Sequence, residues 1–531
     1  MGHVCFDDGG EVVCGGRAGC ADDSDRLVCV QGAAAANYFP ATIEAYMSHV
    51  PLLVLTSDRP HELRHSGANQ TIDPVKMFGD HVLQAFDLAI PTADMPDLAW
   101  RNVATTAVRA YAIANGHRKG AVHINFPFRK PLQPKDTQEW LANRDQTAAD
   151  LPAISTIETG AIMPTRQQVE TLTNLINQHE RGIIICGPRC PDGGFPTAVS
   201  RLAQAAGYPI FADPISNVRF GSHVAQAPII SGYETWLANG TQPSFESPEV
   251  VIRFGAVPTS KWLNGYLNSI DPAVRLHIRA SGVWADDSHL TTDFWQVDET
   301  ALCQLTQSLL ARRPADWFAQ TQAWEIKNWK QLTAVMPTEQ FDIPLFQQAL
   351  SQLPNQANIF VGNSLPIRHF DQFARAQANQ WRVFGNRGAS GIDGLISTAI
   401  GIATAEPETP AVLIIGDVSF FHDMNGLLLA KSTPNLTILL FNNDGGGIFN
   451  RLPINQFEET FTKFFTTSHG LDYRHTAELY GLTHTAVQNG TELENALTTP
   501  WLSAPHIIEI FTDNGRDEQL RRQLIANFHT S

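Results

Sequence analysis

Residues 411–447, AVLIIGDVSFFHDMNGLLLAKSTPNLTILLFNNDGGG, decide the fold of this 531-residue chain. Two short apolar runs, 412–415 and 437–441, have the length and composition of buried strands. Gly-Asp follows the first run and Asn-Asn the second, with 24 residues between the two pairs, which is room for one helix and one strand. The stretch therefore predicts two neighbouring parallel strands whose polar ends meet at one edge of a sheet.

The same alternation extends outward in both directions. It predicts strands at 27–30, 52–56 and 121–126, then at 182–186, 209–212, 250–254 and 276–278, and then at 358–361, 412–415 and 437–441. Helices are expected between them, at 33–48 and 167–179 among other places. Polar, proline-bearing stretches at 131–165 and 335–344 separate three blocks. The fold class is thus α/β, with three doubly wound parallel-sheet domains expected at 1–150, 165–335 and 340–531.

Composition excludes several classes of protein. Thirty-seven basic and 53 acidic residues give a net charge of −16, which disfavours binding to nucleic acid. The apolar runs are strand-sized and too short to span a membrane. Seven cysteines without a CxxC pair indicate neither a disulfide framework nor a structural zinc site. No secretory leader opens the chain, so we expect a cytoplasmic protein.

The polar residues at the ends of the two central strands suit a metal–diphosphate site. The Asp417 carboxylate, the Asn443 amide oxygen and the Gly445 carbonyl are hard oxygen ligands of the kind magnesium prefers. The glycines after Asn443 would let the backbone approach phosphate closely. Each piece alone is also typical of an ordinary turn. Their combination, each after a buried strand, favours the diphosphate site.

Four segments then resemble a known family. The pattern from Gly416-Asp417 to Asn442-Asn443 resembles the thiamine-diphosphate motif of a decarboxylase and carboligase superfamily. VGNSLPIR at 361–368, NRGASGIDG at 386–394 and TSDRPHELRHSGANQ at 56–70 are similar to one branch of it. That branch is the 2-succinyl-5-enolpyruvyl-6-hydroxy-3-cyclohexene-1-carboxylate synthase family of menaquinone and phylloquinone biosynthesis. The resemblance runs from about residue 32 to the C-terminus.

The resemblance implies a function and an assembly. It implies an N-terminal pyrimidine-binding domain, a middle domain and a C-terminal diphosphate-binding domain. It also implies active sites that are shared between subunits of a homodimer or homotetramer. The implied cofactors are thiamine diphosphate and Mg²⁺ or Mn²⁺. The implied reaction decarboxylates 2-oxoglutarate on the cofactor and adds the resulting carbanion to isochorismate.

Both substrates are multiply anionic, so an acidic protein needs local cationic groups to hold them. The catalytic and substrate-contacting positions that the resemblance implies are Asp8, Arg59, Gln70, Lys261, Arg368 and Arg387. The cofactor-binding positions are Ser364, Ile392, Gly416, Asp417, Asn443, Gly445 and Ile448. Ile392 is expected to be the apolar wedge that holds the cofactor bent. A lone arginine is usually a surface residue of little energetic effect, but these follow predicted strands, where sites collect.

The N-terminal segment departs from the family pattern. Residues 9–20 are rich in glycine and cysteine and lack periodicity, and the family's Ser-Arg segment is absent. Phe6-Asp7-Asp8 stands where the family has Phe-Asp-Glu, whose glutamate holds N1′ of the cofactor. Asp8 is one methylene shorter, and a misplacement of about 1 Å can slow a reaction about a hundredfold. Two alternatives follow: a cofactor-binding but impaired paralogue, or another thiamine-diphosphate 2-oxoacid decarboxylase or synthase.

A competing motif lies at 61–65. His61-Glu62-Leu63-Arg64-His65 matches HExxH, the pattern of zinc hydrolases that place both histidines on one helical face. No HxxGxxH extension follows, and no glutamate occurs between His65 and Glu139 to supply a third ligand. The segment also belongs to the family-like stretch 56–70. We therefore keep a zinc hydrolase only as a remote alternative.

Overall fold

The structure is a computed structural model. It describes residues 25–29, 33–92, 95–130, 132, 155–238, 245–310, 316–336, 340–499 and 501–530. The chain divides into two compact units. The first comprises Met1–Gly160 with Gly388–Gly401, and the second comprises Ala161–Arg387 with Ile402–Ser531. Among the described residues, no helix is long and apolar enough to cross a membrane.

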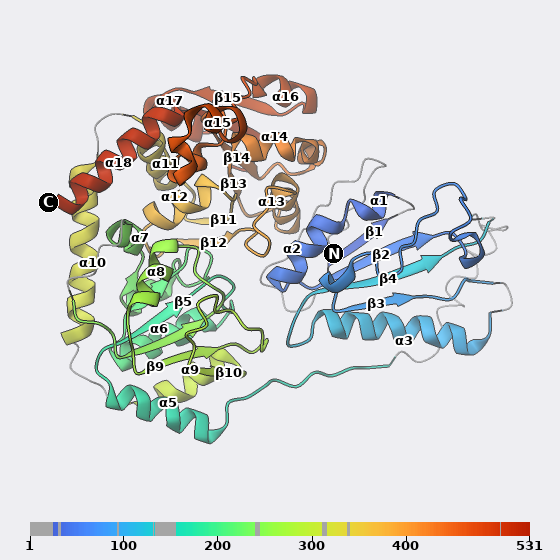
Figure 1. Cartoon of the computed structure of the whole chain (residues 1–531), viewed down its shortest axis with the longest axis horizontal. Helices are drawn as coiled ribbons and strands as arrows, with labels where there is room; N and C mark the ends of the chain where they lie inside the picture. Colours follow the sequence, from blue (N-terminus) through green and yellow to red (C-terminus); the bar gives the residue numbers. More distant parts are fainter. Residues whose placement is uncertain are drawn as a thin grey trace. The chain divides into compact units, whose positions relative to one another are not determined.

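The first unit is built on a four-stranded parallel sheet of order β1-β2-β4-β3 (Figure 1). The strands are β1 (Asp25–Cys29), β2 (Leu52–Asp58), β3 (Gln84–Asp87) and β4 (Ala121–Pro127). Its helices are α1 (Ala33–Ala36), α2 (Phe39–Ser48) and α3 (Asp97–Ala114).

Both faces of this sheet are covered, as expected for a doubly wound fold. Side chains alternate along β2, so Leu52 and Val54 pack on one face in a cluster that includes Ala45 of α2. Leu53 and Leu55 pack on the other face in a cluster that includes residues of α3. The period of two in LLVLT therefore places one helical layer on each side of the sheet.

The helix expected over 33–48 is interrupted. The structure has α1, a turn at Asn37 and Tyr38, and then α2, which has Pro40 in its first turn. Proline lacks an N–H and disfavours helical geometry in the residue before it, so one continuous helix could not pass through this position.

The second unit contains two six-stranded parallel sheets. The middle sheet has the order β10-β9-β8-β5-β6-β7 and the C-terminal sheet the order β12-β11-β13-β14-β16-β15. The middle strands are β5 (Gly182–Cys186), β6 (Ile210–Ala212), β7 (Ile229–Ile230), β8 (Val250–Phe254), β9 (Val274–Ile278) and β10 (Asp293–Trp295). The C-terminal strands are β11 (Gln356–Val361), β12 (Gln380–Phe384), β13 (Ala411–Gly416), β14 (Leu436–Asn442), β15 (Thr483–Val487) and β16 (His506–Phe511).

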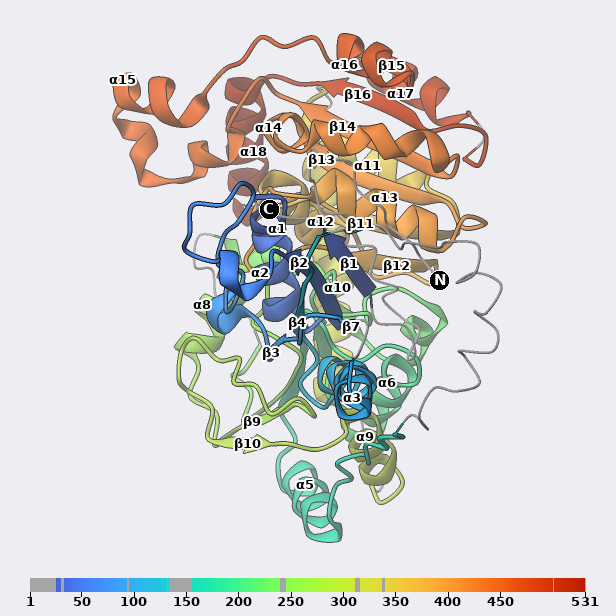
Figure 2. The ribbon, with the colours of Figure 1, turned by 90° about the vertical axis from the view of Figure 1, so that its right-hand side faces the viewer.

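Helices connect the strands of both sheets (Figures 1 and 2). Those of the middle region are α5 (Arg166–Gln178), α6 (Phe195–Ala206), α7 (Tyr233–Leu237), α8 (Lys261–Ser269), α9 (Glu299–Gln307) and α10 (Asp316–Val335). Those that follow are α11 (Asp342–Ser351), α12 (Leu365–Phe373), α13 (Leu395–Ala405), α14 (Asp417–His422), α15 (Glu458–Phe461), α16 (Tyr473–Tyr480), α17 (Gly490–Leu497) and α18 (Asn514–Thr530). Helix α13 begins within the segment Gly388–Gly401 of the first unit and ends in the second unit. One hydrophobic cluster includes residues of both sheets.

A buried ion pair fixes α12 against the middle sheet. The Arg219 guanidinium is fully buried and donates to Asp371 Oδ1 at 2.7 Å and to the carbonyl of Ala212 at 2.6 Å. The Tyr233 hydroxyl donates to the same Asp371 oxygen at 2.7 Å. A buried guanidinium that keeps several acceptors is held in one geometry. This network therefore positions the helix that carries Arg368.

Candidate functional site

The ends of β13 and β14 lie side by side, as residues 411–447 predict. Gly416 pairs with Phe441 in the parallel register, and Asp417 follows at the start of α14. The backbone N–H of Gly445 donates to Asp417 Oδ2 at 2.8 Å, and the N–H of Val418 donates to Oδ1 at 2.7 Å. The two polar turns thus form one structure, joined through the Asp417 carboxylate.

These residues fit a divalent cation. Asp417 is buried, and burial raises the pKa of its carboxyl despite the N–H groups of Gly445 and Val418 that favour the charged form. A buried carboxylate of this kind gains stability from a cation. Among the described residues the Asn443 side chain makes no hydrogen bond, so its amide oxygen is open to a further ligand. The Asp417 carboxylate, the Asn443 amide oxygen and the Gly445 carbonyl are the kind of oxygen donors that magnesium prefers.

Residues 442–447, which the sequence predicts to bind diphosphate and which we call the diphosphate loop, need glycine at their centre. Gly445 has φ of 137°, and a Cβ there would lie 2.0 Å from the Thr466 carbonyl oxygen. A Cβ on Gly446 would lie 2.3 Å from the carbonyl oxygen of Phe465. A hydrogen bond also joins the loop to residues 465–466, because Gly446 N–H donates to Thr466 O at 2.7 Å. The glycines therefore allow the backbone of 445–446 to pack closely against the backbone of 465–466.

A second group of predicted residues gathers where β11 and β12 end. Arg368 donates to the Ser364 carbonyl at 2.6 Å, and Arg387 donates to Asn363 Oδ1 at 2.9 Å. Ser364 precedes α12 with φ of 72°, a strained conformation for a residue with a side chain. Burial lowers the pKa of Arg368, and the nearby positive charge of Arg387 lowers it further. Two adjacent cations of this kind suit a ligand with carboxylates.

This cationic group adjoins the diphosphate loop. Leu365 Cδ1 would lie 3.0 Å from a Cβ on Gly447, so the first residue of α12 contacts the end of that loop. Further along, an Arg451 guanidinium N–H lies 3.0 Å from His369 Nε2. Ser364 and Arg368 thus share one region of the second unit with Ile448, which follows the loop and is half-buried. The sequence predicts each residue separately, and the fold brings them together.

Two further residues, Lys261 and Glu234, lie near this cationic group. The sequence predicts Lys261 as a site residue but not Glu234. Lys261 is the first residue of α8, and its ammonium lies 4.6 Å from the centre of the Trp262 ring. Ser260 caps α8 and also donates its hydroxyl to Glu234. Burial raises the pKa of Glu234, whereas Arg451, Lys261 and Arg368 favour its charged form. No motif marks Glu234, because its importance depends only on these spatial neighbours.

The remaining predicted residues that are described belong to the first unit. Arg59 directly follows β2, and Gln70 is exposed with φ of 58°. Ile392 is half-buried, in a segment that Glu44 holds against α2 through the N–H groups of Gly388 and Ala389. Asp8 and the irregular stretch 9–20 lie outside the described residues.

The HExxH segment does not have the form that a zinc site of that kind requires. Residues His61–Leu63 form a single 3-10 turn, Arg64 is extended and His65 has φ of 59°. The two histidines therefore do not share an α-helical face. His61 and Arg64 instead contact Asp87, at 3.2 Å and 3.1 Å. In the described part of the chain, no group of three histidine, cysteine or acidic side chains could hold a metal ion.

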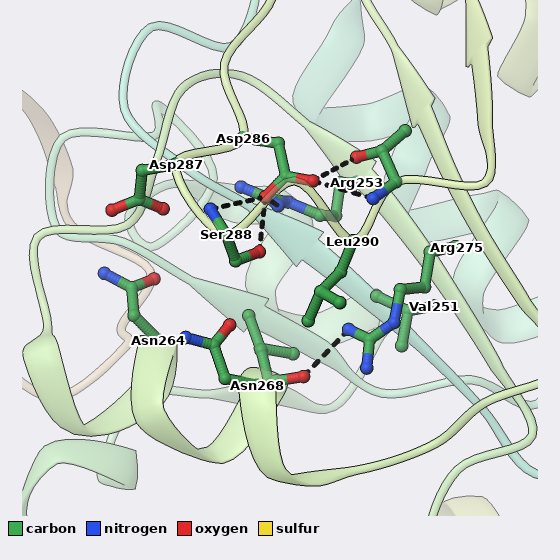
Figure 3. A pocket seen from close by; sticks show the side chains of 11 residues that line it. Val251, Arg253, Asn264, Asn268, Arg275, Asp286, Asp287, Ser288 and Leu290 are labelled. Carbon is green, nitrogen blue, oxygen red and sulfur yellow. Dashed lines mark hydrogen bonds and ion pairs between the residues drawn. The ribbon is translucent and has the colours of Figure 1, made fainter.

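A small pocket lies on the middle sheet, and one of its walls is α8, the helix that begins at Lys261 (Figure 3). It is lined by residues of β8, β9, α8 and the segment 286–291. Asp286 accepts hydrogen bonds from Ser288, Thr291 and Arg253, and these donors lower the pKa of its carboxyl against the effect of burial. None of the predicted site residues lines this pocket.

Comparison with protein families identifies two domains. Residues 140–361 match the family described as the middle domain of thiamine pyrophosphate, and residues 367–510 match the C-terminal TPP-binding domain of thiamine pyrophosphate enzymes. Thiamine pyrophosphate is another name for thiamine diphosphate. The second match includes the ends of β13 and β14, so the predicted diphosphate site lies within a thiamine-diphosphate-binding domain.

Individual relatives extend the similarity over nearly the whole chain. A 2-succinyl-5-enolpyruvyl-6-hydroxy-3-cyclohexene-1-carboxylate synthase of Roseiflexus sp. is 46% identical over 97% of this chain and 89% of its own length. The enzyme of that name from Bacillus cytotoxicus is 37% identical over 94% of this chain and 85% of its own length. A solved structure, benzoylformate decarboxylase from Polynucleobacter necessarius, has a TM-score of 0.63 at 16% identity, over 92% of this chain and 87% of that one. That likeness supports the three-sheet α/β architecture.

Proposed function

This chain belongs to the family of thiamine-diphosphate-dependent 2-succinyl-5-enolpyruvyl-6-hydroxy-3-cyclohexene-1-carboxylate synthases, and on that premise we propose its substrates, its metal and its site residues. The proposed reaction removes CO₂ from 2-oxoglutarate and joins the remaining succinyl unit to isochorismate, in menaquinone biosynthesis. One observation carries the assignment of residues: the cations Arg368 and Arg387 gather beside Ser364, next to the diphosphate loop.

The proposed metal is Mg²⁺, with Mn²⁺ as a substitute. Asp417, Asn443 and the Gly445 carbonyl would hold it, and Gly416, Ser364 and Ile448 would line the cofactor nearby. When bound, thiamine diphosphate supplies a stabilised carbanion equivalent after loss of CO₂. What supports this assignment is the buried Asp417 carboxylate, held by the N–H groups of Gly445 and Val418.

The proposed role of the cations is to bind and orient the substrates. Arg368, Arg387 and Lys261 would neutralise substrate carboxylates in a protein whose net charge is −16. From the first unit, Arg59 and Gln70 would contact substrate, and Ile392 would support the cofactor from its apolar side. Asp8 would take the place of the family's glutamate, holding a proton at N1′ of the aminopyrimidine.

The domain functions and the assembly are also proposals. We assign pyrimidine binding to 1–150, the middle domain to 165–335 and diphosphate binding to 340–531. The two family matches support the second and third of these assignments. The family resemblance supports a homodimer or homotetramer with shared active sites, acting in the cytoplasm. Another thiamine-diphosphate 2-oxoacid decarboxylase would need fewer cations than the group at Arg368 and Arg387 provides.

The direct test is reconstitution. The purified chain is incubated with thiamine diphosphate, Mg²⁺, 2-oxoglutarate and isochorismate, and both CO₂ and the adduct are measured. We expect both products in equal amounts, with CO₂ dependent on cofactor. CO₂ without adduct would favour a simple decarboxylase, and pyruvate consumed in preference to 2-oxoglutarate would favour a different synthase. The Asp417→Ala variant should lose magnesium-dependent cofactor binding by calorimetry, and unchanged affinity would contradict the metal assignment.

A further inference from the structure

A histidine from a later segment reaches the Asp417 carboxylate. His469 Nε2 lies 3.2 Å from Asp417 Oδ2, the same oxygen that accepts the N–H of Gly445. The His469 side chain is 16% exposed and Asp417 is 4% exposed, so water competes little for this contact. His469 is separated from Asp417 by 52 positions and belongs to none of the motifs in the sequence.

The backbone decides which ring nitrogen of His469 carries the proton. The N–H of Leu471 points at His469 Nδ1 from 3.0 Å, so Nδ1 is an acceptor. Nδ1 also lies 3.5 Å from Asp444 Oδ1, but that oxygen already accepts the N–H groups of His469 and Gly470. The proton of the neutral ring therefore resides on Nε2, which donates it to Asp417 Oδ2.

The ring itself is held in place on several sides. Its neighbour Tyr473 lies at 5.7 Å, edge to face, and the Tyr473 hydroxyl donates to the Asp417 carbonyl at 3.0 Å. Asp444 anchors the backbone of His469 from the diphosphate loop. The imidazole is thus a fixed donor aimed at a carboxylate. Carboxylates that bind metals are commonly oriented by such outer hydrogen bonds, whose loss costs about 10- to 100-fold in metal affinity.

We propose that His469 is a positioning residue of the metal site: its Nε2–H donates to Asp417 Oδ2 and orients this carboxylate toward the cation. The inference rests on the proposed assignment of Asp417 as a ligand and adds a residue outside the cofactor motif. The segment that carries His469 also packs on Gly446 through Thr466. The site is therefore supported from beyond the two strand ends that the motif describes.

The test measures metal binding directly. Mn²⁺ is titrated into the full-length chain with saturating thiamine diphosphate, and free Mn²⁺ is followed by electron paramagnetic resonance. His469→Ala should raise the Kd for Mn²⁺ about 10- to 100-fold. His469→Gln places an N–H near the position of Nε2 and should stay within about threefold of the native chain, whereas the shorter His469→Asn should behave like alanine. His475→Ala, at an exposed histidine of α16, is the matched control and should bind as the native chain does.

The outcomes separate this inference from the proposed function. If the native chain fails to bind Mn²⁺, the metal site itself is wrong. If the native chain binds and His469→Ala binds equally well, the positioning role of His469 is overturned. Equal weakening in the glutamine and alanine variants would overturn the donor role. Melting curves of the metal-free variants report the structural effect separately. The melting temperatures of His469→Gln and His469→Asn should be similar, although their Kd values for Mn²⁺ differ.

Discussion

Glu44 on α2 accepts a hydrogen bond from the backbone N–H of Gly388, 344 positions further along the chain, at 2.7 Å. Its second oxygen accepts the N–H of Ala389 at 2.7 Å, and Ser48 donates to the first. A Cβ on Gly388 would lie 2.7 Å from Ser48 Oγ, which explains the glycine at this point. One carboxylate thus fixes the start of the segment that carries Ile392.

We expect Glu44→Ala to loosen this segment. Hydrogen bonds to a charged group contribute about 1.5 to 3 kcal/mol each, and both N–H groups would lose their acceptor. Hydrogen exchange at Gly388 and Ala389 should accelerate, while exchange in the second unit stays unchanged. Ser48→Ala keeps both contacts to the backbone and serves as the control. Native exchange rates in Glu44→Ala would show that the segment is held by other contacts.

Gly445→Ala should damage the diphosphate loop. The new Cβ would meet the Thr466 carbonyl at 2.0 Å, at a φ that only glycine adopts easily, so the loop must move. We expect weaker thiamine diphosphate binding by calorimetry, by at least about tenfold, and a lower melting temperature. The control is Gly265→Ala, where a Cβ in α8 would meet nothing within 4 Å. Native affinity in Gly445→Ala would contradict the close packing on Thr466.

Arg368→Ala and Arg387→Ala should impair substrate use more than cofactor binding. A charge-assisted pair contributes about 1.5 to 3 kcal/mol, which corresponds to roughly 10- to 100-fold in kcat/KM. Arg382→Ala is the matched control, because Arg382 lies on β12, the strand that precedes Arg387, and is paired with Glu406. Native kcat/KM for both substrates in the two variants would show that neither arginine holds a carboxylate.

Asp342 should make stability depend on pH. Burial and the neighbouring Asp517 carboxylate raise the pKa of Asp342 to about 8, against the opposing charge of Arg451. The native chain therefore keeps a proton that the unfolded chain loses above about pH 4. The contribution of Asp342 to the free energy of unfolding is complete at low pH. It falls as pH rises toward 8, by at most about 1.4 kcal/mol per pH unit. His369 Nε2 lies 3.2 Å from Asp342 Oδ2, and the Asp517 carboxylate accepts the backbone N–H of Asp342.

The Asp342→Asn variant checks this prediction. Its melting temperature relative to the native chain should rise steadily from pH 5 to pH 8, because the amide does not titrate. Asp287→Asn, at an exposed aspartate, should give a difference that is constant over this range. A constant difference for Asp342→Asn as well would mean that its carboxyl titrates at an ordinary pKa in the folded chain.

Asp8 should limit turnover. The aspartate is one methylene shorter than the family's glutamate, and a displacement of about 1 Å can slow a reaction about a hundredfold. Asp8→Glu together with a family-like upstream segment should raise kcat by at least about tenfold. Asp8→Asn in the same background should abolish the gain. A kcat of about 1 per second or more in the unmodified chain lies in the ordinary range for enzymes and would refute this limit.

The buried parallel strands could be predicted from the sequence because each is a compact apolar run. Val250–Phe254 and Gly182–Cys186 match their predicted bounds, and the predicted strand at 437–441 differs from Leu436–Asn442 by one residue at each end. Edge strands such as β3, β10 and β15 were missed because they are partly exposed and carry no such run. Strand β16 was missed because Glu509 interrupts it. That carboxylate is buried against Asn442 and His484, partners that only the folded sheet supplies.

The sequence by itself determined the α/β class and the diphosphate motif, because alternating apolar runs and glycine-rich turns are local properties of the chain. It also marked Asp417, Arg368 and Arg387 through family-like segments. Only the tertiary structure decided which residues support them. His469, Glu234 and Glu44 belong to no local pattern, since each acts on residues between 26 and 345 positions away. Such roles arise when distant segments meet in space, where hydrogen bonds and charges depend on distance in three dimensions and not on order along the chain.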